Sequence, residues 1–163
     1  MNWPVGLGGK GSEGVTGLVK QKQGTIGYVE LSYATQNHLP VASIQNRAGN
    51  WVQPSPAGTT AAIEAFYAEL QKDVRTPIVD PPASAPDAYP ISGLTFLLVP
   101  KQPKDAARGQ VVKDFVQFVI TQGQNSAEPL QYARLPQSLS EQNQKLLAGV
   151  QGRQQTSENQ SHP

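Results

Sequence analysis

Apolar residues recur three and four positions apart in four stretches of the chain, with polar residues between them. On an α-helix such residues share one face, so the pattern predicts four amphipathic helices. We expect the apolar face of each helix to be buried against the rest of the chain. The predicted helices cover residues 12–21, residues 59 or 60 to 72, residues 103 to just before Gly123, and residues 138–150.

The two C-terminal helices have the most explicit predicted faces. We expect Gly123 at the C′ position of the third helix, where glycine often ends a helix. A further short helical piece is expected to hold Leu130 and Tyr132, and to begin or kink at Pro129 because proline disrupts a helix interior. The residues expected to be buried are Val111, Val112, Phe115, Val116, Val119 and Ile120 in the third helix, and Leu139, Leu146, Leu147 and Val150 in the fourth.

Other stretches have the composition of β-strands. Residues 25–31 are rich in β-branched and aromatic residues, which predicts a largely buried strand. Residues 93–99 are apolar on both faces, which predicts a central strand. Residues 41–45 and 51–53 flank a five-residue loop that contains Gly49, and they predict a β-hairpin. Between these elements, the proline-rich residues 73–89 predict a surface loop.

Length and composition exclude several classes of function. A chain of 163 residues predicts one domain, and a net charge of +1 gives no basic surface for nucleic acid. The absence of cysteine excludes disulfides and thiolate metal sites, and it fits an exported protein. With only His38 and His162, a histidine-rich metal site is not available either. No stretch approaches the roughly twenty apolar residues of a membrane helix.

The chain also lacks a set of residues that could carry out catalysis. No nucleophile, base and acid can be assembled from the chain, so we predict a binding protein, without a cofactor, rather than an enzyme. His38 and Arg47 lie in polar turns, and we expect both side chains to be solvated. Residues 151–163 have no apolar side chain and are predicted to be disordered, because they cannot bury enough surface to offset the entropy of ordering.

Glycines concentrate before the first predicted helix, at positions 6, 8, 9 and 11, and Ser12 is expected to be the N-cap. A strand, a glycine turn and a helix N-terminus form a layout that binds anions. Gly6-x-Gly8-x-x-Gly11 matches the dinucleotide fingerprint, but the preceding strand is short and contains Pro4. The phosphate-binding P-loop is excluded because Gly11, not serine or threonine, follows Lys10. A tight structural turn is the simpler interpretation.

Four ordered blocks resemble one known family. They cover residues 3–15 (Trp-Pro-Val-Gly-Leu-Gly-Gly-Lys-Gly-Ser-Glu-Gly-Val), 24–34 (Gly-Thr-Ile-Gly-Tyr-Val-Glu-Leu-Ser-Tyr-Ala), 87–96 (Asp-Ala-Tyr-Pro-Ile-Ser-Gly-Leu-Thr-Phe) and 132–136 (Tyr-Ala-Arg-Leu-Pro). The blocks are similar to the phosphate-specific substrate-binding proteins of bacterial ABC transporters, and only to the C-terminal half of that family.

The resemblance implies an α/β fold of the periplasmic-binding-protein type II, two-lobed, of which this chain would form a C-terminal portion with a mixed sheet and packed helices. Residues 1–31 would be the remnant of the second lobe, and residues 32–150 the C-terminal part of the first. The implied partners are inorganic phosphate and the membrane permease of an ABC importer. The implied location is the periplasm or the cell surface.

The resemblance also determines what can be expected of the site. The family holds phosphate with backbone amides, hydroxyls, an arginine and a carboxylate, and these residues would lie upstream of Met1. Because no signal peptide follows Met1, we expect an N-terminally truncated form. The ligand-binding candidates that remain are Gly8, Gly9, Lys10, Gly11 and Ser12.

Glu30 could be a buried polar group or a cleft residue, although an edge or hinge carboxylate satisfied by local contacts is the simpler interpretation. Two alternatives for the whole chain stay open. One is a stand-alone interaction module without ligand binding, and the other is a nucleotide-binding domain that uses residues 6–11.

Overall fold

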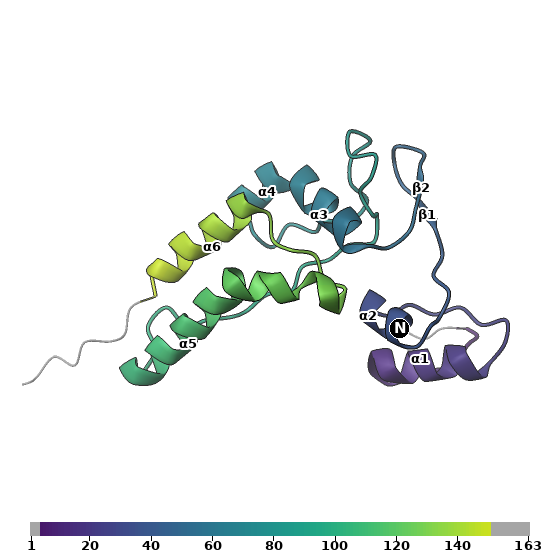
Figure 1. The fold of residues 1–163 in the computed structure, drawn as a ribbon, viewed down its shortest axis with the longest axis horizontal. Helices are drawn as coiled ribbons and strands as arrows, with labels where there is room; N and C mark the ends of the chain where they lie inside the picture. The colour runs from purple at the N-terminus through teal and green to yellow at the C-terminus, as the bar shows by residue number, and fades with distance from the viewer. Residues whose placement is uncertain (1–3, 151–163) are drawn as a thin grey trace, which may run out of the picture.

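Helices are the main regular structure of the protein. The computed structural model describes residues 4–150, so the predicted disorder of residues 151–163 lies outside the described residues. In Figure 1 the molecule is elongated, with α1 and α2 at one end and α3 to α6 grouped in a helical body. In chain order the elements are α1 (Gly11–Gln21), α2 (Leu31–Gln36), β1 (Ile44–Gln45), β2 (Trp51–Val52), α3 (Pro56–Ala65), α4 (Tyr67–Lys72), α5 (Ala106–Ile120), the 3₁₀ turns η1 (Gln122–Ser126) and η2 (Glu128–Leu130), and α6 (Gln137–Ala148).

The N-terminal unit, residues 4–37, consists of the glycine turn and of α1 and α2, which pack against each other. The N-cap of α1 is Lys10, so the prediction that Ser12 would cap this helix is wrong. Gly11, the first residue of the helix, has a φ of 65°, which glycine adopts without steric cost. Glu13 in the first turn and Lys20 in the last turn both interact favourably with the helix dipole.

Residues 25–30 return across α1 without a bend or a turn. A Cβ built on Gly27 would lie 2.9 Å from a side-chain carbon of Val15 and of Val19, so the backbone touches the helix there. No described strand pairs with this segment, and α2 already begins at Leu31. The predicted strand over residues 25–31 is therefore wrong, because its backbone has no ladder partner among residues 4–150.

The predicted hairpin is confirmed, although its strands are shorter than predicted. β1 and β2 are antiparallel, with Ile44 opposite Val52, and they form the one sheet in the described residues. The side chain of Asn46, at the start of the turn, is buried. Its Nδ2 donates to the carbonyl of Pro86 at 2.7 Å, and its Oδ1 accepts from the Asn50 amide at 3.0 Å. This side chain fixes the proline-rich loop against the hairpin, and the mixed sheet that we predicted is not formed by residues 4–150.

The helix predicted from residue 59 or 60 to 72 is divided in two. Ser55 caps α3 by accepting a hydrogen bond from the Gly58 amide at 3.0 Å, and Pro56 occupies the first helical turn, where proline is tolerated. The helix therefore begins before Thr59. It ends at Phe66, whose φ of −105° and ψ of 14° are not helical, and α4 continues from Tyr67.

Two clusters of buried side chains form the core of the helical body. The first joins α3, α4, the proline-rich loop and α6, and the second joins α5 to the end of α6. Leu135, in the segment before α6, packs against both clusters. The clusters consist of Ile63, Leu70, Ile78 and Leu139, and of Ile120, Leu147 and Val150.

The face that we predicted to be buried on α5 is largely exposed. Of its six residues only Ile120 is buried; Val111 is 68% exposed and Phe115 60%. The reason is that α6 covers one side of α5, and no described element covers the other side. α5 also ends at Ile120, which places Gly123 inside η1 rather than at C′.

The last helix is confirmed within two residues at each end, with one correction to its contacts. Leu139, Leu147 and Val150 are buried as predicted, whereas Leu146 is 60% exposed. Residues 93–99, predicted as a central strand, have no strand partner in the described part of the chain. Only Leu94 and Val99 of this segment pack against the core clusters.

Leu147 and its neighbour Leu146 provide a matched test of this packing. We expect Leu147→Ala to lower the free energy of unfolding by about 2–5 kcal/mol, because it opens a cavity in the second cluster. Leu146→Ala removes the same atoms from an exposed position and should change it by less than about 0.5 kcal/mol. Urea denaturation measures both values, and equal losses would contradict the assignment of the buried face of α6.

Candidate functional site

The glycine turn is folded tightly against the first turn of α1. A Cβ built on Gly9 would lie 2.6 Å from the nitrogen of Val15 and 2.7 Å from the carbonyl carbon of Gly14. A Cβ on Gly14 would lie 3.1 Å from the carbonyl carbon of Gly9. Real Cβ atoms do not approach a backbone this closely, so glycine at position 9 is required by contact between two segments of backbone.

The five candidates from the sequence lie on this turn, but the structure does not gather their side chains around a common point. Gly8, Lys10 and Gly11 are exposed, and Gly9 and Ser12 are half-buried. No hydrogen bond from a described side chain caps the N-terminus of α1. A free helix N-terminus alone does not identify a ligand.

The dinucleotide interpretation of residues 6–11 requires a parallel strand directly before the glycines. The described residues form a single antiparallel hairpin, at residues 44–52, and no strand precedes the turn from Pro4 onward. The positive φ of Gly6, 121°, and of Gly11, 65°, is what the tight turn needs from these positions. The geometry therefore matches the structural turn and not the nucleotide fold.

Glu30 connects the N-terminal unit to the helical body. Its carboxylate Oε2 accepts a hydrogen bond of 2.7 Å from the hydroxyl of Tyr132, 102 residues further along the chain. The expectation that Glu30 is satisfied by local contacts is therefore wrong. The Glu30 carboxylate raises the pKa of Tyr132 above its usual value, because the hydrogen bond and the negative charge both favour the protonated phenol.

The segment that presents Tyr132 is itself held in place by polar side chains. Gln124 in η1 uses both ends of its amide: Oε1 accepts from the Leu135 amide at 2.8 Å, and Nε2 donates to the Val119 carbonyl at 2.8 Å. Ser140 of α6 donates to the carbonyl of Ile120 at 2.6 Å, which satisfies the end of α5. Arg134 forms an ion pair with Glu128. Sequence analysis missed this arrangement because its partners lie in different elements.

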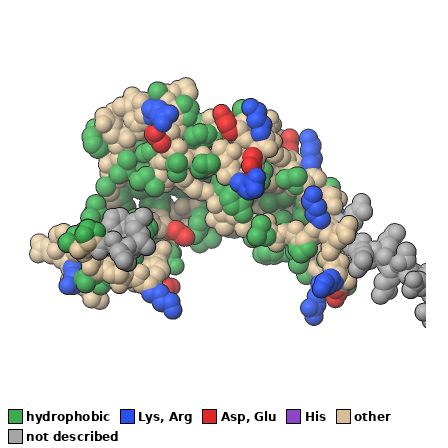
Figure 2. Space-filling model, turned by 180° about the vertical axis from the view of Figure 1, so that it is seen from behind, with side chains coloured by type: hydrophobic (Ala, Val, Ile, Leu, Met, Phe, Trp, Pro, Cys, Tyr) green, Lys and Arg blue, Asp and Glu red, His purple; other side chains and the backbone are tan. Residues whose placement is uncertain are grey.

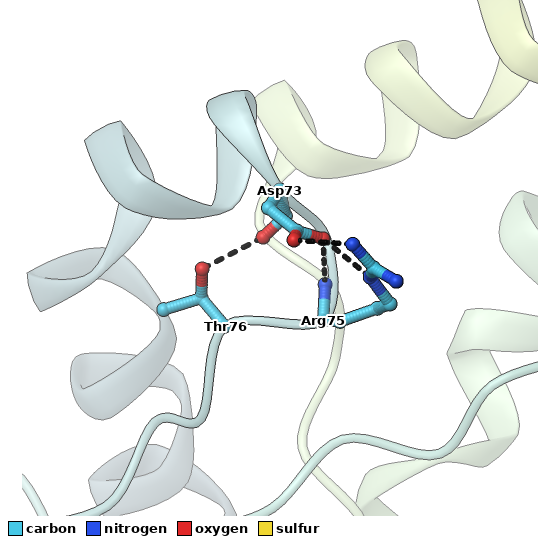
Figure 3. A network of polar contacts seen from close by, with 3 residues as sticks. All are labelled: Asp73, Arg75 and Thr76. Atoms are coloured by element: carbon cyan, nitrogen blue, oxygen red, sulfur yellow. Dashed lines mark hydrogen bonds and ion pairs between the residues drawn. The ribbon is translucent and has the colours of Figure 1, made fainter.

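The most strongly shifted carboxyl pKa in the described residues belongs to Asp73, at the end of α4 (Figure 3). Arg75 donates to its carboxylate from Nε at 2.9 Å, from Nη2 at 2.8 Å and from its own backbone N–H at 3.0 Å. These hydrogen bonds lower the pKa of Asp73 to about 2. Shifted pKa values often mark functional sites. Here both partners are exposed and two residues apart, so the cluster is a local turn that ends the helix.

Among residues 4–150 there is no group of three or more His, Cys, Asp or Glu side chains that could hold a metal ion. In the same residues no helix is long and apolar enough to span a bilayer. His38 is exposed, as predicted, with a φ of 54°. Arg47 is exposed but paired with Asp80, across the space between the hairpin and the proline-rich loop.

The contact between Gly9 and Gly14 predicts a specific sensitivity. We expect Gly9→Val to lower the thermal midpoint by several degrees, because its side chain would overlap the backbone of α1. Gly8→Val is the matched control: a Cβ there meets no atom within 4 Å, and its φ is not positive. Differential scanning calorimetry of both variants measures the midpoints, and equal midpoints would show that the turn does not pack as described.

The Asp73 turn predicts a pH dependence of known sign. Because the folded-state pKa of Asp73 is lowered, to about 2, the contact with Arg75 holds above the unfolded pKa of about 3.9 and is lost as the pH falls through about 2. We expect the carboxyl pKa of Asp73, followed by NMR, to rise towards about 3.9 in Arg75→Gln. An unchanged pKa in this variant would mean that Arg75 is not the cause of the shift.

Comparison with known proteins finds relatives along most of the chain. No protein-family model matches it. It is 43% identical over 142 residues to the phosphate-binding protein PstS of Xylella fastidiosa (strain Temecula1), covering 87% of this chain and 38% of that protein. It is 36% identical to PstS of Pasteurella multocida, covering 85% and 40%, and 34% identical to PstS of Methanocaldococcus jannaschii, covering 76% and 35%. The chain is similar to these phosphate-binding proteins PstS and spans about two fifths of their length.

Proposed function

We propose that this chain forms part of the phosphate-binding subunit of an ABC-type phosphate importer. The observation that carries the proposal is its similarity to proteins named phosphate-binding protein, over 76–87% of its own length. The proposal includes a location in the periplasm or at the cell surface and a membrane permease as partner. We also propose that the complete protein has two lobes and that this chain contributes residues to both of them.

The separation of the N-terminal unit from the helical body supports a division between lobes. The two parts lie apart in Figure 1, and the hydrogen bond from Tyr132 to Glu30 joins them. We place the boundary near residue 31, so that residues 1–31 belong to one lobe and residues 32–150 to the other. α2 packs on α1 in this structure, so the N-terminal unit extends to residue 37, a few residues past the proposed boundary.

The ion pairs of the arginines bear on which part of a PstS polypeptide would supply the phosphate donors. Phosphate is usually held by arginine in a bidentate contact, together with backbone amides. Each of the arginines among residues 4–150 is already in an ion pair with a carboxylate: Arg47 with Asp80, Arg75 with Asp73, Arg108 with Asp105, and Arg134 with Glu128. We propose that the anion donors belong to the part of the PstS polypeptide that this chain does not span. The turn at residues 8–12 then supports the site without supplying its main contacts.

A second candidate function is favoured by one observation, the extent of exposed apolar surface on the helical body. Leu98 is 95% exposed, and Val111 and Phe115 are more than half exposed. Such a surface suits a module whose purpose is to bind another protein. The two candidates differ in whether phosphate binds once the rest of a PstS polypeptide is supplied.

A chimera tests the proposed function. We would replace the matched segment of Xylella fastidiosa PstS with the corresponding residues of this chain and measure phosphate binding by titration calorimetry. We expect an affinity within about tenfold of the parent, because the replaced segment supports a site whose donors remain in place. The 163-residue chain alone should bind at least about a thousandfold more weakly, since it lacks most of the donors.

The parent PstS is the control for phosphate binding. A chimera that unfolds cooperatively, as seen by circular dichroism, but does not bind phosphate would contradict the proposed function. Tight binding by the isolated chain would instead locate the donors among its own residues, beginning with the turn at residues 8–12.

A further inference from the structure

The N-terminal unit, residues 4–37, has little contact with the rest of the protein. Neither core cluster includes one of its residues, and every ion pair among residues 4–150 lies outside it. Figure 2 shows a hollow between this unit and the helical body. The orientation of the unit therefore depends on the covalent connection and on the few polar groups that reach across.

The covalent connection is a short exposed segment. The amides of His38 and Leu39 still belong to the end of α2, since they donate to the carbonyls of Thr35 and Ala34 at 3.1 and 2.9 Å. The backbone of residues 40–43 forms no hydrogen bond with a described residue, and all four residues are exposed. A single unpaired segment of this kind leaves the backbone dihedrals free to change, so it does not fix the orientation of the unit.

The second connection is made by one side chain, that of Tyr132. Its hydroxyl donates to Oε2 of Glu30 at 2.7 Å, and the side chain of Ser32 also acts on this hydroxyl. Glu30 is the N-cap residue of α2, so the contact reaches the unit where its backbone enters that helix. Among residues 4–150, no other side chain forms a hydrogen bond between the unit and the helical body.

The backbone that carries Tyr132 is held on both sides. The Tyr132 amide donates to the carbonyl of Ala127 at 3.0 Å, and the amide of Gln131, which has a φ of 65°, donates to the carbonyl of Glu128 at 2.9 Å. On the other side, Gln124 accepts a hydrogen bond from the amide of Leu135. The Tyr132 hydroxyl is therefore presented from a fixed turn of the helical body.

We propose that the hydrogen bond between Tyr132 and Glu30 is a latch that sets the orientation of the N-terminal unit relative to the helical body. When the latch opens, the unit reorients about residues 38–43. The side chain of Tyr132 is not enclosed, since the residue is 48% exposed, and water can replace either partner of the hydrogen bond. The latch can therefore open and close without unfolding either part. The inference goes beyond the proposed function, because it concerns the arrangement within this chain and does not require phosphate.

The test measures the distance between the two parts in the full 163-residue chain. The chain has no cysteine, so Gln21→Cys on α1 and Ala107→Cys on α5, both at exposed positions, give unique sites for a pair of spin labels. Pulsed electron spin resonance then reports the distribution of distances between the labels. In the labelled chain without further changes we expect one main distance.

Tyr132→Phe removes the hydroxyl, and Glu30→Ala removes the acceptor. In each variant we expect the ratio of reoriented molecules to molecules at the main distance to rise about threefold to tenfold, the effect of losing one hydrogen bond. The double variant should rise no further than either single variant, because both changes remove the same contact. Glu30→Gln keeps an acceptor oxygen and should restore part of the main distance.

Tyr28→Phe is the matched control. It removes the same hydroxyl from a residue two positions before Glu30 that is 86% exposed, and the distances should not change. The thermal midpoint, followed by circular dichroism, should stay within about 2 °C in all these variants, because the latch lies outside both core clusters.

Three results would overturn the latch. One is a distance distribution that Tyr132→Phe and Glu30→Ala leave unchanged. Another is an equal change in Tyr28→Phe, which would assign the effect to the loss of any exposed hydroxyl. The third is a fall in the thermal midpoint of Tyr132→Phe as large as that of Leu147→Ala, which would make Tyr132 part of the packed core.

Discussion

A straight apolar segment needs neighbours along its edges as well as on its faces, because its backbone N–H and carbonyl groups require partners once water is excluded. Residues 93–99 have a neighbour on one face only, where Leu94 and Val99 reach the two core clusters. α5 is exposed in the same way, since its residues Ile120 and Val116 reach the second cluster while Val111 and Phe115 lie at the surface. The described residues thus leave the outer face of α5 and the edges of residues 93–99 uncovered.

The two core clusters are nevertheless joined by defined contacts. Leu135 contacts both clusters, and Gln124 holds Leu135 through its backbone amide. The same segment presents Tyr132 to Glu30, so the position of the N-terminal unit depends on how the chain passes between η2 and α6. Each arginine among residues 4–150 also forms an ion pair with a carboxylate.

Local signals predicted the elements that depend on nearby residues. The helix over residues 12–21, the hairpin around Gly49 and the helix over residues 138–150 all form, because capping, turn geometry and apolar spacing are encoded within each segment. The strands at residues 25–31 and 93–99 do not form, because a strand needs a partner and none lies within residues 4–150. The prediction that one face of α5 would be buried was wrong for the same reason. Within the candidate site, the glycines indicated a tight turn, but the pairing of Glu30 with Tyr132 spans 102 residues and has no local signal.

Amide hydrogen exchange of the isolated chain tests most directly whether these segments lack partners. The account predicts that the amides of Leu94 to Val99 exchange at rates close to those of an unstructured peptide, while the amides around Leu147 in α6 are protected by the second cluster. The measurement is made on a monomeric sample, so that association between copies does not protect the segment. Protection of residues 94–99 as strong as that of α6 would contradict the account, because it would show that the chain pairs this segment within itself.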